Sequence, residues 1–336
     1  MRTSCISAIC LCAMVTGQAE AAYTLIDGAI VDASYIAELP VEAHWNAAVR
    51  ANDACDWREA ARQFTIVQTN FISSPYAQEA SFYIGVANYN LQEYDLANMA
   101  FTDYLQAKTH PRLFLEALEY KFCIADQFRC GARRRIMGTK RLPKWAGGIP
   151  LSIQIYDEII AALPGHQLAV QSLYSKGVLY WCEKEYQKSV EAFQTVVRRF
   201  PKHELTPECY LLINRVFLDQ CQSEFQNPDI LAFAQINFRR YEQQFPRDER
   251  LEGAAAGVLA IKEVYATGLF ETGAFYERVG RPSAAAIYYH NAAAQFPDTS
   301  VASLCQSRLV QLGYQIPDLE KPCDSTCETL APQQEA

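Results

Sequence analysis

Cysteine is the residue type here with the clearest capacity for chemistry, since the sequence has 12 cysteines in 336 residues. Two of them, Cys323 and Cys327, lie in a polar, proline-bounded segment near the C-terminus. Exposed thiols form disulfides in an oxidising compartment, so we predict that these two pair with each other or with another chain. The cysteines between residues 55 and 305 fall in helical patterns, and we favour the interpretation that they are small buried hydrophobes. A CxxxC spacing without a second Cys or His pair predicts no zinc site.

Catalytic patterns are missing from the sequence. It contains no GxSxG, HExxH, GxGxxG or Walker sequence, and its carboxylates scatter along helix surfaces. His110, His166 and His203 lie beside prolines in successive turns of the repeats described below, which a helical array holds apart. We therefore expect no enzyme activity, no catalytic residue, no cofactor, no metal and no small-molecule substrate.

The charge distribution singles out one segment. The chain has a net charge of -8, which disfavours nucleic acid as a partner. Between residues 129 and 148, in contrast, basic residues stand without any acidic one. We favour a solvated loop for this segment, and the alternative is a contact for an acidic partner or an anionic membrane surface. The candidate basic patch consists of Arg133, Arg134, Arg135, Lys140, Arg141 and Lys144.

A repeated pattern predicts the elements that position these residues. A small residue, a second small residue and an aromatic ring recur with the same spacing in three copies. The copies are Gly85, Ala97 and Phe101; Gly177, Ser189 and Phe193; and Gly273, Ala285 and Tyr289. This is the spacing of the 34-residue tetratricopeptide-type repeat, in which small residues let two helices approach and the ring fills the space between them.

The pattern predicts an all-α fold: a right-handed superhelix of about five tetratricopeptide-type helical hairpins with a C-terminal capping helix, Ser303 to Leu312. Partial copies at Ala48, Ala60 and Phe64, and at Ala234 and Phe238, complete the count of four clear units and one degenerate unit. The predicted organisation is a signal peptide over 1–21, an N-terminal extension over 22–40, N-terminal repeats over 41–128, a basic insertion over 129–148, C-terminal repeats and cap over 149–313, and a flexible tail over 314–336.

Aromatic side chains recur on the first helix of each predicted hairpin. In this repeat type the first helix lines the concave side, so its fifth and twelfth positions face a ligand. Large rigid rings give much contact area for little lost entropy, which suits an extended peptide or a helix. We predict that Trp45, Phe82, Tyr89 and Tyr174 form a peptide-binding stripe; packing between neighbouring repeats is an equally weighted alternative for any one ring. The rings at the two positions are Trp45, Phe82, Tyr174 and Phe270, and Tyr89 and Trp181.

The first 21 residues are predicted to be an export signal. Arg2 supplies a positive end, residues 5–15 form an apolar run, and Ala19-Glu20-Ala21 fits small-x-small cleavage. The run is too short to span a membrane, which takes about 20 residues, and no later segment is both long enough and free of charge. We expect an exported protein.

Two stretches of the chain resemble the outer-membrane assembly factor BamD. They are residues 74–111, which begin Ser74-Pro75-Tyr76, and residues 275–299, which begin Phe275-Tyr276-Glu277-Arg278, within a similarity that spans most of 41–312. The resemblance implies a periplasmic scaffold subunit of the machinery that inserts β-barrel proteins into the outer membrane. It implies substrate capture by the N-terminal repeats and docking of the C-terminal repeats on the central barrel subunit.

Carried over to this sequence, the resemblance assigns Trp45, Phe82, Tyr89 and Tyr174 to the capture of unfolded barrel substrates. It places Phe270, Tyr276 and Arg278 near the docking site. It also implies the periplasmic face of the outer membrane as the location.

The sequence departs from the family in its anchor. Members are usually lipoproteins, whereas Cys10 and Cys12 follow the bulky Ile9 and Leu11, where a lipid-attachment box has a small residue. A lipid anchor is therefore doubtful. The alternative function is an envelope repeat protein that coordinates cell-wall synthesis or division.

Overall fold

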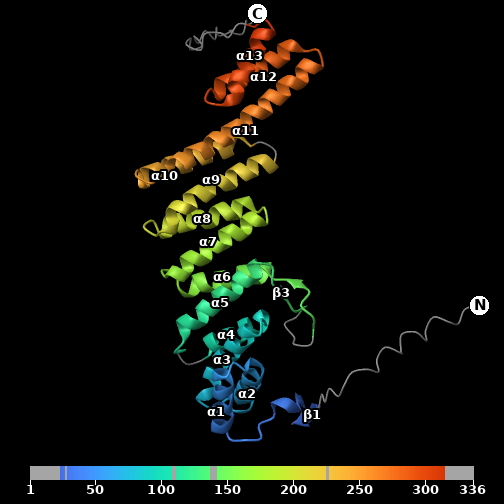
Figure 1. The fold of residues 1–336 in the computed structure, drawn as a ribbon, viewed down its shortest axis with the longest axis vertical. Helices are drawn as coiled ribbons and strands as arrows, with labels where there is room; N and C mark the ends of the chain where they lie inside the picture. Colours follow the sequence, from blue (N-terminus) through green and yellow to red (C-terminus); the bar gives the residue numbers. More distant parts are fainter. Residues whose placement is uncertain (1–22, 27–28, 108–110, 137–141, 225–226, 315–336) are drawn as a thin grey trace, which may run out of the picture. The chain divides into compact units, whose positions relative to one another are not determined.

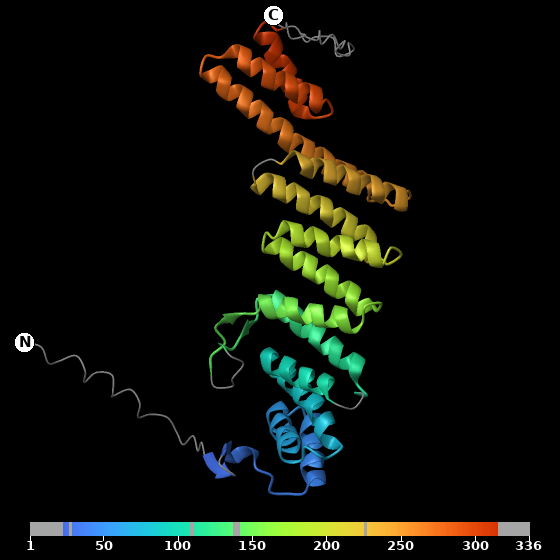
Figure 2. The ribbon, with the colours of Figure 1, turned by 180° about the vertical axis from the view of Figure 1, so that it is seen from behind.

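The computed structural model describes residues 23–26, 29–107, 111–136, 142–224 and 227–314. The described residues form thirteen α-helices, which follow one another as antiparallel pairs (Figures 1 and 2). The chain divides into two compact units, Met1–Ser172 and Leu173–Ala336, and the division falls inside one helix. The signal peptide, residues 140 and 141, and the tail beyond residue 314 lie outside the described residues.

The first unit contains three helical hairpins preceded by a small antiparallel sheet. Strands β1 (Tyr23–Ile26) and β2 (Ala29–Asp32) pair with Tyr23 opposite Asp32, and the 3-10 helix η1 (Ala33–Tyr35) follows. The helices are α1 (Val41–Asp53), α2 (Trp57–Asn70), α3 (Tyr76–Asn90), α4 (Tyr94–Gln106), α5 (Phe114–Arg129) and α6 (Ile149–Ala162).

Three further hairpins and a last single helix follow, and the division between the units falls inside α7. The helices are α7 (Gln167–Cys182), α8 (Tyr186–Arg199), α9 (Leu205–Ser223), α10 (Pro228–Gln244), α11 (Leu251–Arg278), α12 (Pro282–Gln295) and α13 (Ser300–Gln311). The last helix packs its buried Cys305 and Leu309 with α12, so the predicted capping helix is confirmed and begins three residues earlier.

The predicted close approach of paired helices is confirmed at all three glycines. A Cβ atom added to Gly85 would lie 2.7 Å from the Phe101 ring, and one added to Gly177 would lie 2.6 Å from the Phe193 ring. The same contact recurs between Gly273 and Tyr289, at 2.7 Å. These distances leave no room for a side chain, so the all-α, tetratricopeptide-type hairpin fold expected from the sequence is the fold of the chain.

The turns between paired helices share a left-handed residue. One such residue occupies the same place in each of four hairpins: Cys55 (φ 58°), Gln92 (φ 59°), Lys184 (φ 60°) and Gly280 (φ 74°). In each, the amide of the next residue donates to a carbonyl five residues back, as in Glu93 N to Asn88 O at 2.8 Å. This is the Schellman arrangement that ends an α-helix.

Six hairpins are present in the described residues, one more than predicted. The additional pair is α5 and α6, in which Ser152 and Tyr156, both fully buried, occupy the small and ring positions of the second helix. Ser152 Oγ donates to Ala125 O at 2.8 Å, as Ser189 Oγ donates to Gly177 O at 2.9 Å. The pair was missed because the basic insertion separates its two helices.

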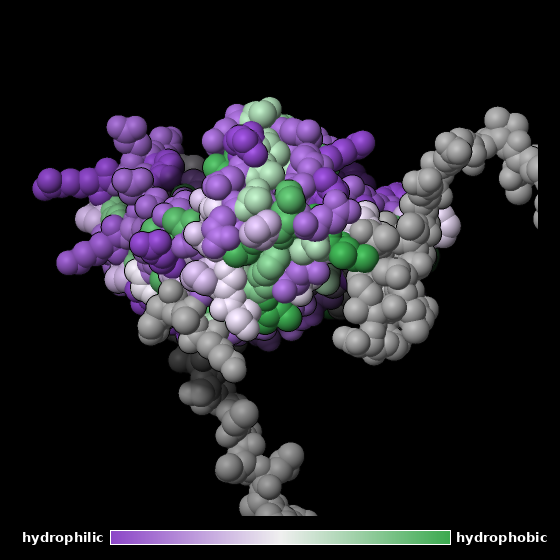
Figure 3. All heavy atoms as spheres, turned by 90° about the horizontal axis from the view of Figure 1, so that it is seen from below, coloured by the Kyte–Doolittle hydropathy of each residue, from purple (hydrophilic) through white to green (hydrophobic). Residues whose placement is uncertain are grey.

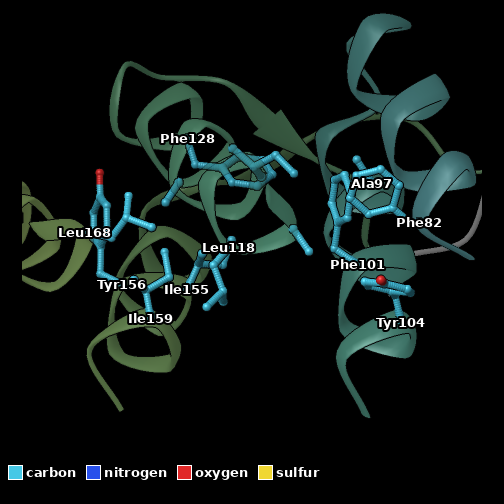
Figure 4. Close-up of a cluster of buried hydrophobic side chains, with 13 residues drawn as sticks. Phe82, Ala97, Phe101, Tyr104, Leu118, Phe128, Ile155, Tyr156, Ile159 and Leu168 are labelled. Atoms are coloured by element: carbon cyan, nitrogen blue, oxygen red, sulfur yellow. The ribbon is translucent and has the colours of Figure 1, made fainter. Parts of the chain in front are cut away.

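A buried cluster in the first unit joins α3, α4, α5 and α6 (Figure 4). Phe82 lies beside Phe101 and Tyr104, and a second group forms around Leu118, Ile155 and Ile159. On the face nearest α1 the surface is largely hydrophilic, with hydrophobic side chains in a narrow strip (Figure 3). A terminal repeat needs such a polar outer face because no neighbour covers it.

Helix α11 is unusual in its length. Among the described residues it alone has a length and composition that would allow it to cross a membrane. From the sequence, no segment after the export signal was expected to have this property. It contacts α9 and α10 along one part and α12 and α13 along another, so it belongs to the helix packing of the second unit.

Candidate protein-binding surfaces

The predicted aromatic residues of the first unit pack against one another rather than standing alone. Trp45 stacks on Tyr76, with ring centroids 4.9 Å apart, and meets the edges of Phe64 at 5.4 Å and Tyr83 at 5.9 Å. It is half-buried. Trp45 therefore joins α1, α2 and α3 and keeps part of its ring accessible.

Phe82 does not reach the surface. Its exposed fraction is 6%, and its ring contacts Phe101 at 5.6 Å, Tyr104 at 5.4 Å and Tyr120 at 6.2 Å. The predicted role in ligand contact is wrong for this residue, because the next hairpin covers it. Phe82 is a packing residue.

Tyr89 continues the same series of rings. It lies 5.3 Å from Tyr120 and 5.7 Å from Tyr94, and it is half-buried. Burial raises the pKa of the Tyr89 hydroxyl. The structure thus connects Trp45, Phe82 and Tyr89 through ring contacts, with only Trp45 and Tyr89 partly accessible.

The remaining predicted rings lie in the second unit. Tyr174 is half-buried with its ring 5.9 Å from Phe193, and Trp181 donates its Nε1–H to Asp219 Oδ2 at 3.0 Å. The indole of Trp181 therefore links α7 to α9. Tyr174 belongs to the second unit and Trp45, Phe82 and Tyr89 to the first, so the single four-residue stripe stays a prediction.

Near the C-terminus, Phe270 packs on Tyr289 at 5.4 Å and Tyr276 stacks on Tyr288 at 5.3 Å. Both are half-buried, whereas Arg278 is exposed. At the C-terminal end of the same helix, Phe275 and the capping residue Val279 are each 51% exposed and one turn apart. Sequence reasoning missed this pair because their positions in the repeat predict no role.

A groove of about 500 Å³ lies between α8 and α10, and we call it the α8–α10 groove. Its floor is apolar and buried, with Tyr210, Ile213 and Phe217 of α9. Its rim carries Phe233, 54% exposed, and Ile236, 44% exposed. Large apolar side chains at the mouth of an apolar groove mark an interaction site.

Polar atoms in the floor of this groove already have partners. Asn237 donates to Tyr210 O and to Asn214 Oδ1, both at 2.9 Å, and Tyr210 OH donates to Gln244 Oε1 at 2.8 Å. The floor therefore offers hydrophobic contact to a ligand. The charged rim groups are Glu191, Arg198 and Arg240, with both arginines toward the C-terminal ends of their helices.

The basic insertion forms a short hairpin, β3 (Arg133–Arg134) paired antiparallel with β4 (Ala146–Gly147), which stands off the side of the first unit in Figures 1 and 2. Arg135 is buried at its base and forms ion pairs with Glu93 and with Asp95, the latter at 2.9 Å. Lys144 Nζ lies 2.9 Å from Glu93 Oε2.

These ion pairs correct the predicted basic patch. Burial alone would raise the pKa of Glu93, but hydrogen bonds from Arg135 and Lys144 outweigh it and lower the pKa of this carboxyl. Arg135 and Lys144 thus neutralise acidic groups of their own chain and are not available to a partner. Arg133 is exposed and Arg134 is half-buried, while Lys140 and Arg141 lie outside the described residues.

The cysteines divide into two groups. Cys209, Cys221 and Cys305 are buried as expected, and burial raises the pKa of the Cys209 thiol to about 12 and that of Cys305 to about 11. The others are exposed, against the prediction: Cys55, Cys123, Cys130 and Cys182. Cys323 and Cys327 lie outside the described residues. Within the described residues no group of His, Cys, Asp and Glu side chains is arranged to hold a metal ion.

Comparisons with known proteins assign no family. No protein-family model matches the sequence, and no curated protein matches it. Among solved structures, the chain is similar to MamA, residues 41 to the end, from Desulfovibrio magneticus RS-1. The two are 16% identical over 62% of this chain and 97% of that chain, with a TM-score of 0.34. A similarity at this level gives no functional assignment.

Proposed function

We propose that this chain is a non-catalytic protein-binding scaffold of the outer-membrane β-barrel assembly machinery, exported to the periplasmic face of the outer membrane. The sequence resemblance of residues 74–111 and 275–299, the export pattern of residues 1–21 and the helical-hairpin fold support the proposal. The observation that carries it is the α8–α10 groove, an open apolar surface within a helical array.

The groove fits one amphipathic helix of a partner. It lies between two helices over a third, so a guest helix can bury its apolar face against Phe233, Ile236 and the floor. Arg198 and Arg240 favour an acidic residue at one end of that guest. Since the resemblance implies that the C-terminal repeats dock on the central barrel subunit, we assign this groove to that docking.

The accessible rings of the first unit have a second role in this proposal. Trp45 and Tyr89 are partly exposed, and flat aromatic surfaces accept apolar side chains of many sequences. This suits an unfolded barrel substrate, which presents alternating apolar residues. Phe82 is linked to the two rings through Tyr83 and Tyr120.

A co-purification experiment tests the docking. Phe233→Glu and Ile236→Glu place a charge in the groove without disturbing the core, so we expect each to lower recovery of the barrel subunit with the full chain about tenfold or more. Leu259→Glu is the matched control, because Leu259 is 38% exposed on α11 and lies outside the groove. Equal recovery with all three variants would contradict the assignment.

Site-specific crosslinking identifies the occupant. A photoreactive residue in place of Phe233 should capture the barrel subunit, and one in place of Tyr89 should capture unfolded barrel substrate. Capture of cell-wall synthases at Phe233 would instead support the envelope alternative, in which the scaffold coordinates cell-wall synthesis or division.

A further inference from the structure

The hairpin formed by β3 and β4 exposes apolar side chains together with cations. Trp145 is 70% exposed, Ile136 43% and Leu142 39%. Arg133, in the same hairpin, is also exposed. An exposed tryptophan of this degree is uncommon, because burying an indole removes a large apolar surface from water.

The base of the hairpin is firmly attached to the first unit. Arg135 N and Nη1 donate to the two carboxylate oxygens of Asp95, each at 2.9 Å, and Lys144 Nζ donates to Gln92 O at 2.9 Å. A Cβ atom added to Gly148 would lie 2.4 Å from Phe128, so the chain leaves the hairpin in close contact with α5. These contacts attach the base of the hairpin to α4 and α5.

The pairing at the base also divides the cations by role. Arg135 and Lys144 are used for attachment. This leaves the exposed Arg133 and the half-buried Arg134 of the paired strands, and Arg134 Nε also donates to Gly147 O at 3.2 Å. The segment 129–148 contains no acidic residue, although the chain as a whole has a net charge of -8. The hairpin is therefore a local basic surface in an acidic protein.

We propose that this hairpin binds an anionic phospholipid surface. Trp145, Leu142 and Ile136 enter the headgroup region, where tryptophan is favoured at membrane interfaces. Arg133 and Arg134 bind lipid phosphates. Apolar side chains for insertion together with cations, on a protruding element rather than in a groove, favour a lipid surface over an acidic peptide.

Vesicle sedimentation of the purified full chain tests the proposal. We expect binding to phosphatidylcholine vesicles that contain phosphatidylglycerol, weak binding to phosphatidylcholine alone, and loss of binding as salt is raised. Arg133→Gln combined with Arg134→Gln should weaken binding roughly 30-fold, since each cation near an anionic surface contributes about a factor of five. Trp145→Ala should weaken it severalfold.

Three control variants make the result specific to the hairpin. Arg58→Gln removes an exposed cation from α2, and Ile72→Ser removes an apolar side chain that is 78% exposed; both should bind vesicles like the unmodified chain. Phe233→Glu impairs the proposed protein-binding groove and should leave vesicle binding intact, so the two proposals fail separately.

Quenching by lipids brominated on their acyl chains reports insertion directly. The quenching of tryptophan fluorescence seen with the unmodified chain should fall with Trp145→Ala. Three outcomes overturn the proposal: equal binding of hairpin and control variants, binding that does not depend on phosphatidylglycerol, or a hairpin that is needed only for recovery of an acidic protein partner while vesicles are not bound.

Discussion

At the scale of single residues, three glycines decide how closely paired helices approach. Gly85, Gly177 and Gly273 each face an aromatic ring of the partner helix at a distance that excludes a methyl group. Glycine lowers helix propensity, so its presence at these positions is a cost that packing offsets. The same residue type can therefore stabilise or destabilise a helix here, depending on what lies across from it.

Gly85→Ala should destabilise the protein by about 1–3 kcal/mol, because the added methyl group pushes against Phe101. Gly253→Ala is the matched control: an added Cβ there meets nothing within 4 Å, so alanine should stabilise α11 by about 0.5–1 kcal/mol. Denaturant unfolding of the two variants measures both changes. A similar effect of the two substitutions would contradict the packing interpretation.

Residue identity alone did not reveal which aromatic side chains stay accessible. The fifth position of a hairpin can face a ligand, but it can also be covered, as Phe82 is by Tyr104 of its own hairpin and by Tyr120 of the next. The outcome depends on side chains more than 20 positions away. The sequence predicted the set of rings and could not predict which of them the array buries.

At the scale of elements, Arg250 holds the turn between α10 and α11 through Asp248 and also contacts α9 through Glu208. Asp248 accepts hydrogen bonds from Arg250 N and Nε, each at 3.0 Å, and Arg250 Nη1 lies 3.1 Å from Glu208 Oε2. Arg250 keeps the pKa of Asp248 well below its usual range. The second unit thus depends on an ionised carboxylate at this turn.

Asp248→Asn should cost about 1–2 kcal/mol of stability at neutral pH. A carboxyl whose pKa is lowered by folding stabilises the protein above its unfolded pKa, near 4, and this contribution is lost as the pH falls towards the folded value. The difference between the variant and the unmodified chain should therefore shrink below about pH 4. Unfolding curves measured across this range test the sign.

Asp298→Asn provides the comparison for the acid dependence. Asp298 pairs with Lys262 at 3.0 Å, but its side chain is 66% exposed. An exposed ion pair contributes little, so this variant should differ from the unmodified chain by less than about 0.5 kcal/mol at any pH.

The attachment of the β3–β4 hairpin gives a second prediction for elements. Arg135→Gln leaves Asp95 buried without its cation, and we expect a loss of about 3 kcal/mol together with faster hydrogen exchange at the hairpin amides. Arg133→Gln, at an exposed position two residues earlier in the hairpin, should leave both unchanged. Equal exchange in the two variants would mean that the ion pairs do not hold the hairpin.

The hairpins with regular spacing could be predicted from sequence, and those with insertions could not. Gly85, Ala97 and Phe101 have the spacing that packing imposes, so they identify their hairpin directly. Ser152 and Tyr156 fill the same positions in α6, but the insertion moves them out of the 34-residue frame. The α8–α10 groove was missed because it depends on the separation of two helices, which no local pattern encodes.

At the scale of the whole molecule, stability is distributed over separate cores. The first unit has buried clusters around Phe64 and around Phe128, and the second has clusters around Tyr289 and around Tyr241. In an array of hairpins each one contacts its neighbours, so a local change spreads over a limited distance.

This distribution makes a prediction for native-state hydrogen exchange. Gly85→Ala should raise exchange strongly in α3 to α6, where Phe101 packs, and leave α12 and α13 protected, because the latter pack in a different cluster. Mass spectrometry of the exchanging protein resolves the two regions. A uniform increase along the chain would indicate a single cooperative unit.

Substitution of the left-handed turn residues that are not glycine should raise the melting temperature of this protein. Cys55, Gln92 and Lys184 adopt a backbone conformation that costs a side-chain-bearing residue about 1 kcal/mol relative to glycine, and the fourth turn already uses Gly280. Replacing all three by glycine should add about 2 kcal/mol and raise the melting temperature by several degrees, whereas glycine at the helical Arg58 should lower it. The chain already uses glycine in this conformation at Gly131, Gly280 and Gly313, so the repeat architecture shows where the same substitution fits.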